Sequence, residues 1–146
     1  MQLKYRLPFP KRIKKKLAKP KGLYAHENYP ESRYAIDFVM PVGTPILAAR
    51  AGKVVRVKDN SDKWGVDFQY EDKVNYVVIK HRNGTFAEYL HFRKKQIVVK
   101  IGDKVKTGDL LGYSGLSGCM DKPHFHFNVL KIRNGKVISI QVKFKK

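Results

Sequence analysis

From residue 34 onward, short stretches of alternating apolar and polar residues recur between glycine-containing turns. In Tyr34–Val39, for example, successive side chains would point to opposite faces of a strand. Further strands are expected at residues 44–49, 53–57, 75–80, 85–91, 96–99, 110–113, 124–130 and 137–142. Because no stretch beyond the N-terminal 22 residues has helical periodicity, we predict an all-β fold. Asn83-Gly84 and Asn134-Gly135 predict type I′ hairpin turns, which need positive φ at both central positions.

The chain has 146 residues, enough for one domain with a single apolar core. Residues 1–22 are predicted to form a basic N-terminal arm, since prolines and a cluster of lysines interrupt any regular element there. Residues 23–146 are predicted to form the folded domain. A single cysteine, Cys119, excludes an internal disulfide, and no apolar run is long enough to span a membrane.

The composition is strongly basic, with 31 Lys and Arg against 12 Asp and Glu, a formal charge of +19. Nucleic acid, an anionic membrane and an acidic cell-wall polymer are all conceivable partners, and the charge does not choose among them. No nucleic-acid recognition motif is present, so no specific nucleic-acid partner is expected. Residues 1–22 lack the apolar region of a signal peptide, which leaves open whether a leader has been removed.

The histidines carry the strongest chemical signal. In His124-Phe125-His126-Phe127, a strand would point both imidazoles to one face and both phenyl rings to the core. Asp37 lies in an apolar strand, where a carboxylate needs a partner. His91 ends another predicted strand, and a glycine-rich loop, residues 112–118, precedes the His-Phe-His-Phe stretch. A metal site and a pair of half-exposed strand histidines both remain possible from these residues alone.

Taken together, five segments resemble the lysostaphin-type zinc metallopeptidases, the duplicated-hybrid-motif (LytM-like) endopeptidases that cut peptidoglycan cross-bridges. They are Tyr34–Pro45, Tyr89–His91, Gly102–Val105, Gly112–Gly118 and Pro123–Phe127. The resemblance covers roughly residues 22–130. It implies a mostly antiparallel β-sheet with the site in a groove along its face, so that residues 23–146 would be a lysostaphin-type metallopeptidase domain.

The resemblance also implies roles for individual residues. Asp37 and His126 would be zinc ligands, and His91 and His124 would be catalytic. The usual position of the remaining ligand, four residues before the aspartate, holds Arg33, which cannot bind zinc. In one branch of the family this histidine lies further upstream, and His26, eleven residues before Asp37, fits that variant. A solvated loop histidine is the alternative for His26.

Other positions are expected to matter less. His81 precedes a hairpin tip, where histidines are usually exposed, and is given no role. Tyr89, or the backbone of residues 115–118, is expected to border the substrate. Lys122 and Asn128 depart from the residues usual in the family, glycine and glutamate, and we expect these departures to affect substrate preference more than the chemistry.

The function implied by the resemblance is a zinc-dependent endopeptidase acting on the peptide cross-links of bacterial peptidoglycan. We expect a monomer without a membrane span, located in the cell envelope or secreted, that anionic envelope polymers could attract. Two alternatives remain open at this point. The chain could be a catalytically inactive, wall-binding regulator of the same fold, or a basic polyanion-binding β-domain with incidental histidines.

Overall fold

Alternation of side chains produces the strands at the centre of the molecule. The computed structural model describes residues 4–13, 16–18 and 26–145. In the strand Tyr76–Lys80 (β7), Val77 and Ile79 are fully buried, and in the strand Phe86–Leu90 (β8), Ala87 and Tyr89 are fully buried. Burial of every second side chain therefore fixes one face of each strand against the core.

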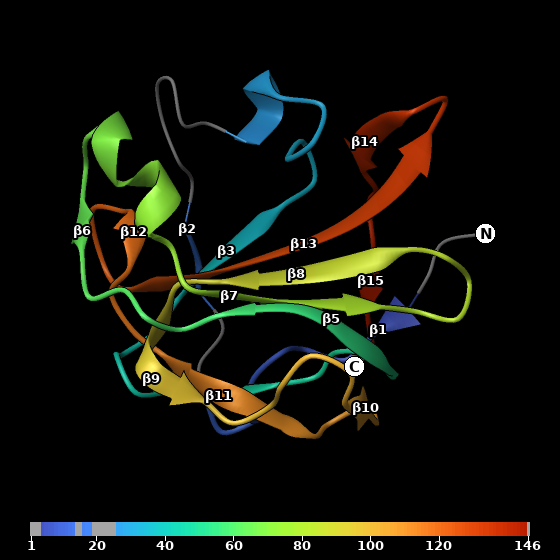
Figure 1. Ribbon diagram of the computed structural model, residues 1–146, viewed down its shortest axis with the longest axis horizontal. Coiled ribbons are helices and arrows are strands. Elements are labelled where there is room, and N and C mark those ends of the chain that lie inside the picture. The colour runs from blue at the N-terminus through green and yellow to red at the C-terminus, as the bar shows by residue number, and fades with distance from the viewer. Residues whose placement is uncertain (1–3, 14–15, 19–25, 146) are drawn as a thin grey trace.

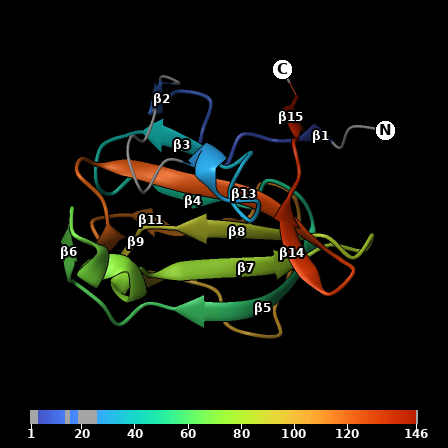
Figure 2. The ribbon, with the colours of Figure 1, turned by 90° about the horizontal axis from the view of Figure 1, so that it is seen from above.

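The largest sheet contains these two strands in the order β10-β5-β7-β8-β13-β3-β2, with β14 pairing β13, and every pairing is antiparallel (Figures 1 and 2). Besides β7 and β8 its strands are Leu17–Ala18 (β2), Ile36–Val39 (β3), Gly52–Lys58 (β5), Lys104–Val105 (β10), His124–Arg133 (β13) and Lys136–Ser139 (β14). The long strand β13 lies between β8 and β3, so it connects the middle of the sheet to the segment that carries Asp37.

Three smaller sheets accompany the largest one in the described part of the chain. An antiparallel sheet has the order β4-β11-β9, formed by Pro45–Leu47 (β4), Phe92–Ile97 (β9) and Leu110–Ser114 (β11). Two parallel pairs join Lys4–Tyr5 (β1) to Lys143–Phe144 (β15), and Trp64–Gly65 (β6) to Gly118–Cys119 (β12). The helical turns in the described residues are 3₁₀, at His26–Asn28 (η2) and Phe68–Lys73 (η3). The predicted all-β, mostly antiparallel fold is confirmed.

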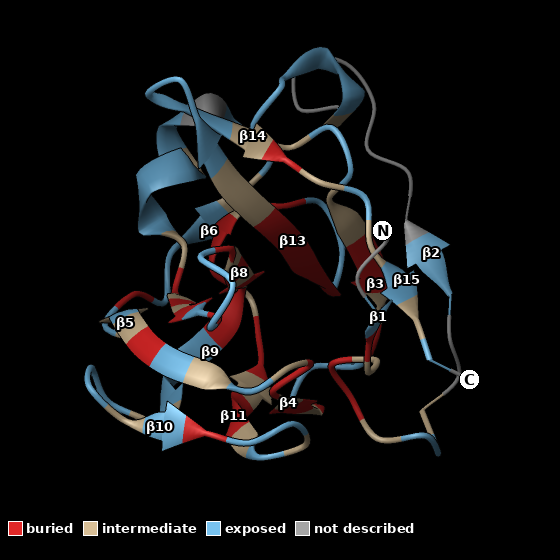
Figure 3. Cartoon of the chain, turned by 90° about the vertical axis from the view of Figure 1, so that its right-hand side faces the viewer, coloured by how far each residue is buried: buried red, intermediate tan, exposed pale blue. Residues whose placement is uncertain are grey.

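One apolar core is shared by the two larger sheets (Figure 3). Phe125 and Phe127 enter it from β13, and Leu111 and Phe92 enter it from the smaller sheet. Within the described residues, no helix is long and apolar enough to cross a membrane.

Side chains of the N-terminal segment also belong to this core. Tyr5 and Phe9 are 0% and 1% exposed, and Phe9 packs edge-to-face on Phe38 of β3 with ring centroids 5.0 Å apart. The described part of residues 1–22 contains the short strands β1 and β2 and a turn closed by Ile13 N–H donating to the carbonyl of Pro10, and it lies against the domain. The division into an arm and a domain at residue 22 stays a prediction.

Candidate metal centre

Strand β13 separates its phenyl rings from its imidazoles. Phe125 and Phe127 are buried in the core, while His124 and His126 point to the opposite face of the sheet. The ladder places His126 directly opposite Asp37 of β3 on one side and Leu90 of β8 on the other. Alternation along the two strands therefore places His126 beside Asp37, although the two residues are 89 positions apart in the sequence.

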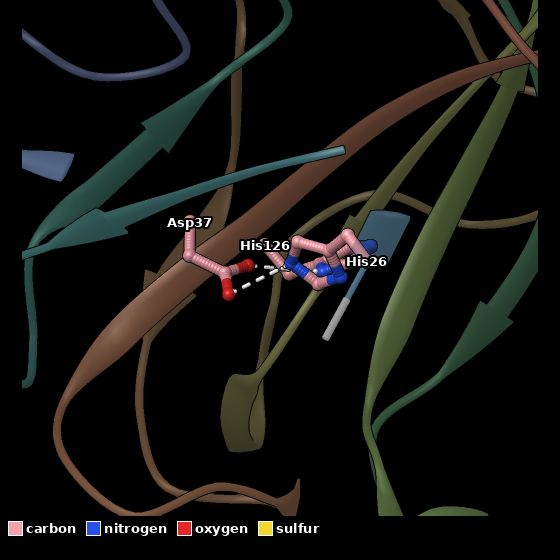
Figure 4. A group of neighbouring side chains, drawn as sticks. All are labelled: His26, Asp37 and His126. Atoms are coloured by element: carbon pink, nitrogen blue, oxygen red, sulfur yellow. Dashed lines mark hydrogen bonds and ion pairs between the residues drawn. The ribbon is translucent and has the colours of Figure 1, made fainter. Parts of the chain in front are cut away.

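Asp37 is the centre of a cluster of histidines (Figure 4). Its Oδ2 lies 2.8 Å from Nε2 of His26 and 3.9 Å from Nε2 of His124, and its Oδ1 lies 3.1 Å from Nδ1 of His126. Burial alone would raise the pKa of Asp37, but hydrogen bonds from His126 and His26 and the charges of His126 and His124 hold it well below its ordinary value. The carboxylate is therefore ionised and already has the partners that its apolar strand requires.

His26, Asp37 and His126 together form a group able to hold a metal ion. One ligand atom from each of the three side chains lies within 4.8 Å of the others. His26 is brought there by η2 and the loop that precedes β3, and its ring centroid lies 4.8 Å from that of His126. The structure thus brings together the three residues proposed as ligands, although they come from three separate segments.

The ring of His126 is enclosed by carboxylates at both nitrogens. Nδ1 faces Asp37, and Nε2 lies 3.6 Å from Oε1 of Glu88 on β8. Burial lowers the pKa of His126, but the hydrogen bond to Asp37 and the negative charges of Asp37 and Glu88 outweigh it and raise the pKa to about 10. The centre therefore attracts cations, and a metal ion binding there would compete with protons.

His124 and His91 lie beside this group and share one arrangement. Nδ1 of His124 donates to the carbonyl of Lys122 at 2.9 Å, and Nδ1 of His91 donates to the carbonyl of Ser117 at 2.6 Å. Because a carbonyl only accepts, each ring carries a proton on Nδ1, and the second nitrogen, Nε2, points elsewhere. In His124 this Nε2 lies 3.9 Å from Oδ2 of Asp37. The two ring centroids are 4.7 Å apart, so two orientated bases lie next to the candidate ligands.

His91 also has an unusual backbone. Its φ of 84° lies in the left-handed region, which non-glycine residues seldom adopt. Its N–H donates to the carbonyl of Asn75 and its carbonyl accepts from the N–H of Gly115, which holds this conformation. Burial, together with the charges of His124 and His126, lowers the pKa of His91 to about 3, so the ring is neutral.

Three supporting residues were not predicted from the sequence: Glu88, Asn75 and Ser117. Asn75 is fully buried, its backbone N–H donates to the hydroxyl of Ser117, and that hydroxyl donates to the carbonyl of Phe92. These contacts fix the loop whose carbonyl orientates His91. Glu88 carries a signal that could have revealed it, since it is a carboxylate in an apolar strand, as Asp37 is.

Two sequence-based expectations are wrong. His81 is 3% exposed rather than solvated, because its Nδ1–H donates to the carbonyl of Ala51 and its ring packs on Tyr5. Of the two alternatives for the border of the substrate site, Tyr89 is wrong, because it is fully buried and its hydroxyl accepts the N–H of Ala49. Side chains alternate between the two faces of a strand, so Tyr89 lies on the face opposite to Glu88 and Leu90, which is the core face. The backbone of residues 115–118 stays a prediction.

Residues 31–140 match Peptidase family M23. Over 94 residues the chain is 38% identical to the peptidoglycan DD-endopeptidase ShyA of Vibrio cholerae, an alignment that covers 64% of this chain and 19% of that protein. The chain spans about a fifth of the length of the curated relatives it matches.

Solved catalytic domains match most of the chain. The catalytic domain of the prophage-encoded M23 protein EnpA from Enterococcus faecalis superposes with a TM-score of 0.63 and 28% identity, covering 93% of both chains. The catalytic domain of lysostaphin from Staphylococcus simulans gives a TM-score of 0.60 and 27% identity, covering 88% of this chain and 89% of that one. The likeness therefore extends over nearly the whole of two catalytic domains.

Proposed function

Because the chain belongs to peptidase family M23, we propose that it is a zinc-dependent endopeptidase that hydrolyses peptide cross-links of bacterial peptidoglycan. The observation that carries the proposal is the convergence of His26, Asp37 and His126 beside two histidines whose Nδ1–H groups are bound to backbone carbonyls. The relatives include lysostaphin and the peptidoglycan DD-endopeptidase ShyA, and the name of the latter supports the substrate.

The donor set suits zinc. Two imidazole nitrogens and one carboxylate oxygen are ligands that catalytic zinc sites use, with a further position left for water or substrate. The three donors converge within 4.8 Å, Asp37 is ionised, and Glu88 adds a second negative charge nearby. His26, Asp37 and His126 would hold the ion, and no cysteine is needed.

When bound, Zn²⁺ lowers the pKa of water and polarises the scissile carbonyl. The chain itself supplies proton handling and orientation. His124 can accept a proton at Nε2 and His91 can accept a hydrogen bond at Nε2, because their Nδ1–H groups are committed to carbonyl oxygens of Lys122 and Ser117. A positioned acid or base of this kind accelerates a reaction by about 10²–10⁴-fold.

The remaining parts of the proposal concern the whole protein. We propose a basic N-terminal arm at residues 1–22, a peptidase domain at residues 23–146, and a monomer that acts in the cell envelope or outside the cell. Anionic envelope polymers are proposed as secondary partners because of the +19 charge.

Defined cross-bridge peptides and purified peptidoglycan, incubated with the zinc-loaded protein, test the activity, with fragments identified by mass spectrometry. We expect cleavage by the wild type, and His124→Ala should retain zinc while losing about 10²–10⁴-fold in rate. Asp37→Asn should lose zinc and activity together. Asp62→Asn, which changes an exposed carboxylate paired with Lys94, is the matched control and should keep both.

Two outcomes would contradict the proposal. A wild type that binds zinc at the centre yet cleaves neither substrate would favour a non-catalytic, wall-binding member of the fold. Unchanged zinc content in Asp37→Asn would show that the metal binds elsewhere.

A further inference from the structure

Glu88 lies on the same face of the sheet as the candidate ligands. The ladder pairs it with Asn128 of β13, two residues beyond His126, and its side chain is 24% exposed. Its Oε1 lies 3.6 Å from Nε2 of His126 and accepts a hydrogen bond of 3.0 Å from Nδ2 of Asn128. A largely enclosed carboxylate requires such partners, and here one of them is a proposed metal ligand.

Asn128 connects Glu88 to the segment that carries His26. Asn128 is 1% exposed, and both Nδ2 and Oδ1 of its side chain form hydrogen bonds. Nδ2 also donates to the carbonyl of Glu31 at 2.8 Å, and Oδ1 accepts the hydroxyl of Ser139 at 2.7 Å. The hydroxyl of Ser139 in turn accepts the N–H of Tyr34 at 3.0 Å. The network therefore fastens the loop between His26 and β3 at both Glu31 and Tyr34.

A neutral imidazole can bind a metal through one nitrogen only, since the other carries the proton. In His126 the nitrogen that faces Asp37 is Nδ1, so a ligand role at that atom requires the proton to lie on Nε2, next to Glu88. Carboxylates in this outer position orientate ligating histidines, and their removal weakens metal affinity by about 10–100-fold.

We propose that Glu88 and Asn128 are positioning residues of the metal centre. Glu88 fixes the orientation and tautomer of His126, and Asn128 holds both Glu88 and the loop that brings His26 to Asp37. This inference rests on the proposed function, because it needs a metal at His26, Asp37 and His126. Beyond the three ligands, it names two residues that determine the affinity of the centre for the metal.

The test is the zinc dissociation constant, measured by competition with a chromogenic chelator. We expect Glu88→Ala and Asn128→Ala to weaken zinc binding by about 10–100-fold. Glu88→Gln should recover part of the loss, because its amide oxygen can accept the Nε2–H of His126. Glu31→Ala is the matched control, since it removes an exposed carboxylate from the same region while leaving the backbone carbonyl that Asn128 binds.

A second measurement separates orientation from general loss of structure. Imidazole ¹⁵N NMR of the zinc-loaded wild type should show His126 protonated at Nε2, and Glu88→Ala should broaden or shift that signal while leaving His81 unchanged. If the wild type binds no zinc, the proposed function fails, and this inference fails with it. If the wild type binds zinc and Glu88→Ala binds it as tightly as Glu31→Ala does, the positioning role alone is overturned.

Discussion

His81 is a buried histidine outside the metal centre, and it makes the stability of the protein depend on pH. Burial, together with the charge of Arg50, holds the pKa of His81 below its ordinary value, although the hydrogen bond to Ala51 acts in the opposite direction. Its Nε2 has no hydrogen-bond partner in the described part of the chain, and its ring faces Tyr5. The neutral ring is therefore the form that the folded state accommodates.

The unfolded chain takes up a proton at His81 near pH 6.5, whereas the folded protein resists protonation to lower pH. Stability should therefore fall as the pH drops below about 6.5, by at most about 1.4 kcal/mol per unit from this residue. Urea unfolding of the metal-free wild type and of His81→Gln, from about pH 7.5 to about pH 5, measures this contribution. The wild type should lose stability more steeply towards acid, and parallel curves would contradict the assignment.

The role of a single residue can be predicted from the sequence when the pattern of its own strand reveals it, but not when it depends on partners far away in the chain. Asp37 and the His-Phe-His-Phe stretch are recognisable because a strand alternates faces and because an apolar strand makes a carboxylate conspicuous. The burial of His81 depends on Ala51 and Tyr5, which are far from it in sequence. Glu88 is as conspicuous in its strand as Asp37 is, but its partner Asn128 lies 40 residues away, so neither this partner nor the surroundings of His81 could be predicted from neighbouring residues.

Among the loops, the glycine-rich segment before β13 determines where His91 points. Gly118 has φ +83°, and a Cβ at this position would lie 2.6 Å from Cβ of Val74 and 2.9 Å from its Cα. Gly118→Ala must therefore shift the loop whose Ser117 carbonyl holds His91. We expect a large loss of hydrolysis with zinc content retained, measured by peptide cleavage and by metal analysis.

The control for this substitution is Gly84→Ala. Gly84 has a similar φ of +86°, but nothing lies within 4 Å of the position that an added Cβ would occupy. The substitution should lower stability by about 1–2 kcal/mol from backbone strain while leaving turnover unchanged. Equal activity of the two variants would show that the loop position does not govern His91.

The hairpins show how far turn chemistry can be predicted. Asn134 and Gly135 both have positive φ, 52° and 74°, as the expected type I′ turn requires. In the hairpin at residues 81–85, only Gly84 has positive φ. The loop is wider than a type I′ turn, because the N–H of His81 donates to the carbonyl of Thr85. The side chain of Asn83 accepts from both the N–H and the hydroxyl of Thr85, which favours this wider turn over type I′.

Across the whole molecule, the N-terminal residues stabilise the sheet that carries the centre. Phe9 is 1% exposed and packs on Phe38, the neighbour of Asp37. Phe9→Ala should therefore reduce the free energy of unfolding by about 3–5 kcal/mol in urea denaturation. Leu17→Ala, at a position that is 52% exposed, should change it by less than about 0.5 kcal/mol. Similar small effects from both would show that the segment is dispensable for stability.

The formal charge of +19 is a property of the whole chain, and its effect should depend on the length of the substrate. Intact sacculi with anionic polymers present many negative charges, whereas a short neutral cross-bridge peptide presents none. Because the screening length falls from about 10 Å at 0.1 M salt to about 3 Å at 1 M, retention on sacculi should weaken steeply over this range. Hydrolysis of the neutral peptide, which depends on the metal centre alone, should change little. Co-sedimentation with sacculi and cleavage of the peptide, measured across the same salt series, compare retention with hydrolysis directly. Retention that is independent of salt would rule out a role for diffuse charge in binding the wall.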